Sequence, residues 1–98
     1  MVKNISILGS TGSIGNQTID VAQKLGINVV ALSAYKNIDA LIFQTKMLNP
    51  DMICIVDERY YKELKELFPD KIILTGQKGL LEVARYSSAD LVVNALVG

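Results

Sequence analysis

Short apolar runs alternate with longer amphipathic segments along the whole chain. The apolar runs are rich in β-branched residues and cover five stretches: Ile5–Leu8, Val29–Leu32, Met52–Val56, Ile72–Leu74 and Leu91–Val97. Runs that are apolar at nearly every position are typical of parallel strands covered on both faces. The pattern therefore predicts five strands of a parallel sheet.

The segments between these strands have helical spacing and recognisable ends. The first helix should end at Gly26, the second should follow Asn37 as N-cap and end before Pro50, and the third should follow Asp57 as N-cap. The third is expected over residues 58–67 and the fourth, which is short, over residues 79–86. The positions expected to face the core are Ile14, Thr18, Val21, Ala22 and Leu25 in the first helix, Ile38, Leu41, Ile42, Thr45 and Leu48 in the second, Tyr61, Leu64, Leu67 and Phe68 in the third, and Leu80, Val83 and Ala84 in the fourth.

Five strands alternating with four helices predict an α/β fold, a Rossmann-like doubly wound parallel sheet with helices on both faces. In such a sheet the first strand is central, with the second and third strands on one side and the 91–97 strand on the other. The 72–74 strand is then expected at the edge beyond the third. The last run is the most apolar, so we expect a fold truncated after the fifth strand, the first part of a longer protein whose exposed apolar side self-associates. The alternative is a small complete domain with an apolar terminal strand.

Composition excludes several classes of function. The 98 residues carry 10 Lys and Arg against 10 Asp and Glu, which argues against a nucleic-acid partner. No run approaches the roughly 20 apolar residues of a membrane span, so no membrane partner and a cytoplasmic location are expected. The sequence has no histidine and a single cysteine, which leaves no ligands for a zinc site. Cys54 lies in an apolar run, where a buried thiol is expected rather than a reactive one.

A glycine-rich stretch directly follows the first predicted strand and opens the first helix, with the sequence Gly9-Ser10-Thr11-Gly12-Ser13-Ile14-Gly15. Glycine at 9 permits a tight turn, at 12 an approach of backbone to pyrophosphate, and at 15 close packing of helix on strand. The helix N–H groups then face the anion, with hydroxyls of Thr11 and Ser13 as further donors. The G-x-x-G-x-x-G spacing lacks the G-K-[ST] ending of a nucleoside-triphosphate loop, so a dinucleotide is favoured over ATP or GTP.

The end of the second strand indicates which dinucleotide is bound. An NAD site places a carboxylate about 20 residues beyond the loop, but here no acid precedes Asp39. Ser33, Lys36 and Asn37 stand there instead, and these are donors suited to a 2′-phosphate. The predicted cofactor is therefore NADPH.

Elsewhere the polar residues predict no catalytic or metal site. The carboxylates Asp57, Glu58, Glu63 and Glu66 are interpreted as a helix cap and a solvated helix face, and the adjacent Tyr60 and Tyr61 have no catalytic partner at a known spacing. A nicotinamide reaction needs a second substrate site, and the chain contains no visible candidate.

The residues described above resemble a known family. The segments I-S-I-L-G-S-T-G-S-I-G-N-Q-T-I-D-V, V-V-A-L-S-A-Y-K-N and V-V-N-A-L-V-G are similar to the amino-terminal part of the 1-deoxy-D-xylulose 5-phosphate reductoisomerases. The resemblance implies that residues 1–98 are the NADPH-binding domain. It places Thr11, Gly12, Ser13 and Ile14 along the pyrophosphate, Lys36 and Asn37 near the 2′-phosphate, and Ala95 and Leu96 near the nicotinamide. Tyr35 departs from the family, which commonly has glycine there.

The resemblance also implies the activity of the complete enzyme. It rearranges the skeleton of 1-deoxy-D-xylulose 5-phosphate and reduces the product with NADPH to 2-C-methyl-D-erythritol 4-phosphate, an isoprenoid precursor. A divalent metal, Mg or Mn, is held by an Asp and two Glu of a catalytic segment outside these residues, and a homodimer is expected. The fragment alone should bind cofactor without turnover. Two alternatives remain open, another NADP-linked oxidoreductase of the aspartate-semialdehyde dehydrogenase type and a non-enzymatic dinucleotide-sensing module.

Overall fold

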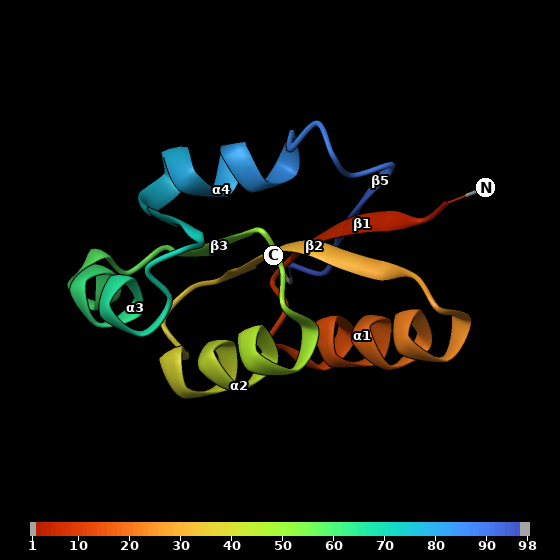
Figure 1. Cartoon of the computed structure of the whole chain (residues 1–98), viewed down its shortest axis with the longest axis horizontal. Coiled ribbons are helices and arrows are strands. Elements are labelled where there is room, and N and C mark those ends of the chain that lie inside the picture. The colour runs from red at the N-terminus through yellow and green to blue at the C-terminus, as the bar shows by residue number, and fades with distance from the viewer. Residues whose placement is uncertain (1, 97–98) are drawn as a thin grey trace.

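Five strands pair in parallel in the order β4–β3–β2–β1–β5 in the computed structural model, which describes residues 2–96 (Figure 1). The strands are β1 (Asn4–Leu8), β2 (Asn28–Ala34), β3 (Met52–Ile55), β4 (Ile72–Thr75) and β5 (Leu91–Asn94). The predicted strand order is confirmed, with β1 between β2 and β5 and with β4 at the edge beyond β3. The predicted fifth strand is too long, because regular pairing ends at Asn94; its last predicted residue, Val97, lies outside the described residues.

Four α-helices connect the strands, namely α1 (Ser13–Leu25), α2 (Ile38–Leu48), α3 (Tyr61–Leu67) and α4 (Gly76–Ala84). A 3₁₀ turn, η1 (Glu58–Tyr60), occupies the beginning of the third predicted helix, and Asp57 caps this turn rather than α3. The fourth helix starts three residues earlier than expected, directly after β4. Within residues 2–96, no helix combines the length and apolar character that crossing a membrane requires.

Both faces of the sheet are covered, as predicted for a doubly wound fold. Figure 1 shows α1 and α2 on one side of the sheet and α4 on the other. The larger core cluster lies under the first two helices and α3, around Ile7, Leu41 and Leu64, which are all fully buried. The smaller cluster lies under α4, around Val83 and Cys54. The sheet is therefore buried between helices, and its carboxyl edge carries the loops that open α1, α2 and η1.

The buried face of α1 differs from the prediction. Ala22 is buried as expected, but Val21 and Leu25 are 52% and 67% exposed, and Ile19 is buried instead. The apolar stripe through Ile14, Thr18 and Val21 does not reach the sheet, because it borders an open groove of about 470 Å³ beside β5. The groove is also lined by Val2, Ile5, Gln17, Ala22, Ile27, Leu91 and Val93. Leu67 and Tyr61 of α3, also predicted inward, are likewise largely exposed, whereas Leu64 is buried.

Candidate functional site

The glycine-rich loop between β1 and α1, residues 9–12, lies at the carboxyl edge of the sheet. Gly9 has φ +78°, a left-handed conformation that a side chain disfavours, and a Cβ there would lie 3.1 Å from the Ala95 backbone. A Cβ on Gly15 would lie 2.3 Å from the Gly9 carbonyl oxygen and 2.6 Å from Ser10. Two of the three predicted glycine roles, the tight turn and the close packing, are therefore confirmed.

Ser33 at the end of β2 anchors the beginning of this loop. Its carbonyl oxygen accepts from the N–H groups of Gly9 and Ser10 at 3.1 and 2.8 Å, and its hydroxyl oxygen accepts from Gly9 N–H at 3.1 Å. Ser33 is only 1% exposed. Its predicted contact with a 2′-phosphate is therefore wrong, because the side chain lies beneath the loop and cannot be reached from solvent.

The amino terminus of α1 presents backbone donors without acceptors. Gly12 is the N-cap and makes no side-chain cap, and the first turn holds no acidic residue. In the part of the chain that the structure describes, the N–H groups of Thr11, Ser13 and Ile14 have no hydrogen-bond partner, while that of Gly12 makes a long 3.4 Å contact with Gly9. A Cβ on Gly12 would meet no atom closer than 3.8 Å. Free amides, the positive end of a helix and open space together suit an anion.

The predicted 2′-phosphate residues lie at the start of α2. Lys36 is exposed, and among residues 2–96 it forms no ion pair with a carboxylate. The Asn37 side-chain oxygen accepts from Ala40 N–H at 3.2 Å, which confirms it as the N-cap of α2. Tyr35, the departure from the family pattern, has an exposed side chain, and its backbone oxygen accepts from Asp57 N–H at 2.8 Å.

Arg59 adds a second cation to this corner and was missed by the sequence reasoning. Its guanidinium binds the carboxylate of Asp57 at 2.6 Å. The pKa of Asp57 is lowered, chiefly by the hydrogen bond from Arg59, with a smaller Coulombic contribution from Lys36. Arg59 is therefore paired with Asp57 at the carboxyl end of β3, and Lys36 lies near enough to act on the same carboxylate through its charge without forming an ion pair. The available signal was a basic residue two positions after Asp57, the acid predicted to cap the helix that follows the third strand.

The tip of β5 completes the carboxyl edge beside the loop. Ala95 is buried and donates its N–H to Leu8 at 2.8 Å, and a Cβ on Gly9 would touch both the Ala95 backbone and Leu96 at 3.1 Å. The predicted residues from the glycine loop and the end of β5 are thus adjacent, and those of the β2–α2 connection lie at the same sheet edge. This edge is where open parallel sheets bind ligands.

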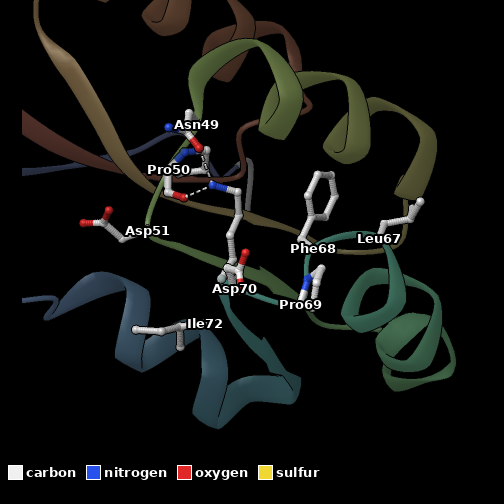
Figure 2. A pocket seen from close by; sticks show the side chains of 9 residues that line it. Asn49, Pro50, Asp51, Leu67, Phe68, Pro69, Asp70 and Ile72 are labelled. Atoms are coloured by element: carbon white, nitrogen blue, oxygen red, sulfur yellow. Dashed lines mark hydrogen bonds between the residues drawn. The ribbon is translucent and has the colours of Figure 1, made fainter.

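A second hollow, of about 530 Å³, lies at the opposite edge, where β3 and β4 begin (Figure 2). Lys71 closes one side of it by donating to the Asn49 side chain and the Pro50 carbonyl, both at 2.6 Å. Its position at the amino ends of the strands separates it from the glycine loop. We therefore do not assign it to the cofactor.

Cys54 is buried as predicted and carries no sign of catalytic activation. Burial raises the pKa of its thiol from 9.0 to about 12, and its sulfur lies 3.7 Å from the Gly76 carbonyl oxygen. Residues 2–96 contain no group of three or more potential metal ligands. A thiol whose pKa is raised this far stays protonated at neutral pH.

Comparison with protein families matches residues 5–98 to the model described as 1-deoxy-D-xylulose 5-phosphate reductoisomerase. The chain belongs to the 1-deoxy-D-xylulose 5-phosphate reductoisomerase family. The expected resemblance is thereby confirmed, and the aspartate-semialdehyde dehydrogenase alternative is set aside.

Relatives in this reductoisomerase family match over almost the whole chain. The reductoisomerases of Protochlamydia amoebophila and Lachnospira eligens are 48% and 47% identical over 99% of it. A crystal structure of DOX-P reductoisomerase in complex with NADPH, fosmidomycin and magnesium superposes with a TM-score of 0.89 at 32% identity, covering 99% of this chain and 25% of the other. The Zymomonas mobilis reductoisomerase in complex with NADPH gives 0.87 at 30% identity, covering 100% of this chain and 27% of the other. The chain spans about 26% of the length of the curated relatives.

Proposed function

We propose that residues 1–98 are the NADPH-binding domain of an enzyme that converts 1-deoxy-D-xylulose 5-phosphate to 2-C-methyl-D-erythritol 4-phosphate. The observation that carries this proposal is the row of unpaired backbone amides at the start of α1, beside a basic corner without a ribose-binding acid at the end of β2. Related reductoisomerases have been crystallised with NADPH, which supports the same assignment.

Each part of the site has a distinct task in this proposal. The amides of Thr11, Ser13 and Ile14 bind the pyrophosphate, and the open space in front of Gly12 admits it. Lys36 binds the 2′-phosphate, and Asn37 offers the side-chain amide group that its cap bond leaves free. NADPH supplies the hydride for the reduction. Ala95 and Leu96, beside Gly9, form the wall on which the nicotinamide end would lie.

The remaining chemistry is assigned to residues outside this chain. Among residues 2–96 there is no group of three or more potential metal ligands. We propose that the divalent metal, Mg or Mn, and the sugar-phosphate substrate are held by other residues of the complete enzyme. We accordingly propose that these 98 residues bind cofactor without turnover. For the complete enzyme we propose a cytoplasmic homodimer that acts in the methylerythritol phosphate route to isoprenoids.

A calorimetric titration of the chain with NADPH and with NADH tests the proposal. We expect tighter binding of NADPH, with the preference reduced about tenfold in Lys36→Ala, because one charge-assisted contact to the 2′-phosphate is lost. NADH affinity should not change, since NADH lacks that phosphate. A folded chain that binds neither nucleotide, or that prefers NADH, would overturn the assignment.

A further inference from the structure

Gln44 is a buried polar residue of α2 that reaches across to the glycine-rich loop. It is only 3% exposed, and its side-chain nitrogen Nε2 donates to the Ser10 carbonyl oxygen at 2.9 Å and to Asn16 Oδ1 at 3.0 Å. Thirty-four residues separate Gln44 from Ser10 in the sequence. The contact therefore links the second helix to the loop that the first helix follows.

Asn16 extends this contact to the next two residues of the loop. Its Nδ2 donates to the carbonyl oxygens of Thr11 and Gly12 at 3.2 and 3.1 Å, and its backbone N–H donates to Gly12 at 2.9 Å. Three consecutive carbonyl groups of the loop are thus held from the side of α1 and α2. None of these donors comes from the open side of the loop.

Holding a carbonyl group also orients the amide that follows it. Across a trans peptide bond, the C=O of one residue and the N–H of the next point in opposite directions. The hold on Ser10 therefore directs the N–H of Thr11 away from α2, and the hold on Gly12 directs the N–H of Ser13 out of the helix end. These are two of the amides that lack a partner in the described part of the chain.

The backbone carbonyl oxygens at which this network ends can only accept hydrogen bonds, and they fix the orientation of the two side-chain amides. Three of the four acceptors are the backbone carbonyl oxygens of Ser10, Thr11 and Gly12, so Gln44 and Asn16 must present nitrogen to them. With this orientation, Gln44 Oε1 stays buried without a partner among residues 2–96. A buried amide oxygen without a partner is unfavourable, so packing alone does not account for glutamine at this position.

We propose that Gln44 is a positioning residue for the cofactor: through Ser10 and Asn16, it holds the loop so that the amides of Thr11 and Ser13 face the pyrophosphate. The inference rests on the proposed function of this site. Gln44 touches no cofactor atom in this account and acts only through the backbone of the loop.

The test measures loop order and cofactor affinity separately in Gln44→Leu and Gln44→Glu. We expect the amide order parameters of Thr11 and Ser13, measured by NMR relaxation, to fall from about 0.85 to below about 0.6 in Gln44→Leu. The dissociation constant for NADPH should rise about tenfold. Gln44→Glu has the same shape but places a carboxylate against the Ser10 carbonyl oxygen, so its affinity should fall further.

Thr45→Val is the matched control, because Thr45 is the next residue of α2, is 1% exposed and donates to Leu41 at 2.7 Å without contacting the loop. It should lower the melting temperature yet leave loop order and NADPH affinity unchanged. If Gln44→Leu does not fold, Asn16→Ala, at an exposed helical position, should loosen Thr11 and Ser13 in the same way.

A rigid loop in Gln44→Leu, or NADPH affinity within twofold of Thr45→Val, would overturn the inference. A different result separates it from the proposed function. If the native chain binds no NADPH but Gln44→Leu still loosens the loop, the assignment of cofactor is wrong and the hold of Gln44 on the loop stands.

Discussion

Aspartate at residue 12 should stabilise the fold and at the same time abolish NADPH binding, because both effects use the same backbone amides. Gly12 is the N-cap of α1, with φ −82° and ψ 178°, a conformation that aspartate adopts without strain. A Cβ there would meet only the Gly9 carbonyl oxygen, at 3.8 Å. In Gly12→Asp the carboxylate would accept from the first-turn N–H groups that the native chain leaves unpaired.

The size of each effect follows from the geometry of the helix end. Aspartate is a better N-cap than glycine by a few tenths of a kcal/mol, and a negative charge at a helix amino terminus adds about 0.3–1 kcal/mol. No acidic residue in the first turn opposes the new charge. The free energy of unfolding should rise by about 0.5–1.5 kcal/mol, which raises the melting temperature by roughly 2–12 °C in a chain of this size. NADPH affinity should fall at least about 100-fold, or about 2.8 kcal/mol, because the pyrophosphate loses its donors and meets a like charge.

Thermal unfolding and calorimetric titration of the same samples would measure both effects. Gly12→Ser is the companion variant, since serine caps the helix without adding charge. It should gain less stability and lose less affinity than Gly12→Asp. If Gly12→Asp binds NADPH as the native chain does, the amides of α1 do not hold the pyrophosphate. If it is less stable than the native chain, the amides are not free as the structure indicates.

Three further predictions concern packing and ionisation. Gly15→Ala should lower the free energy of unfolding in urea by about 1–3 kcal/mol, because its Cβ would lie 2.3 Å from the Gly9 carbonyl oxygen; native stability would contradict the close packing. Cys54 has a pKa raised to about 12 by burial, so at pH 8 it should react with a thiol reagent only after denaturation, and rapid labelling of the native chain would count against this. Asp90 accepts from the N–H groups of Lys3 and Asn4, both at 2.9 Å, and these bonds lower its pKa. The contribution of Asp90 to stability is therefore present above its ordinary pKa of 3.8 and is lost as the pH falls through the lower pKa of the folded state. The melting temperatures of Asp90→Asn and the native chain should accordingly differ at pH 7 and converge in acid.

The strands could be predicted from the sequence because their signal is local. Five runs that are apolar at nearly every position became five strands. Their order was predicted from the fold that the glycine motif indicates, and the observed order agrees with it. The faces of the helices were harder to predict. Periodicity shows that Ile14 and Val21 share an apolar side, but it does not show what that side contacts. In the structure it borders the groove beside β5, and Ile19 packs into the core instead.

The candidate site shows the same division between local and distant information. The glycine spacing of the loop can be read from consecutive residues, and the loop lies between β1 and α1 as predicted. Ser33 and Gln44 could not be assigned correctly from sequence. A serine at the end of a strand can donate to a ligand or accept from a neighbouring loop, and only its burial beneath Gly9 decides between them. A glutamine in an amphipathic helix is ordinarily expected to face solvent, and its contact with Ser10 depends on how α2 lies beside the loop.

The loop combines carbonyl groups that are hydrogen-bonded from α1 and α2 with amides that have no partner among residues 2–96. A helix usually gains order at its amino terminus from a side-chain cap, and the cap then occupies the amides. In this loop the hydrogen bonds come from groups other than a side-chain cap. Ser33 accepts from the first two N–H groups, and Gln44 and Asn16 donate to the carbonyl groups. The Ala95 backbone packs against Gly9. The amides of Thr11, Ser13 and Ile14 have no hydrogen-bond partner among residues 2–96. An anion that binds them therefore meets donors already in place, and little conformational entropy is lost on binding.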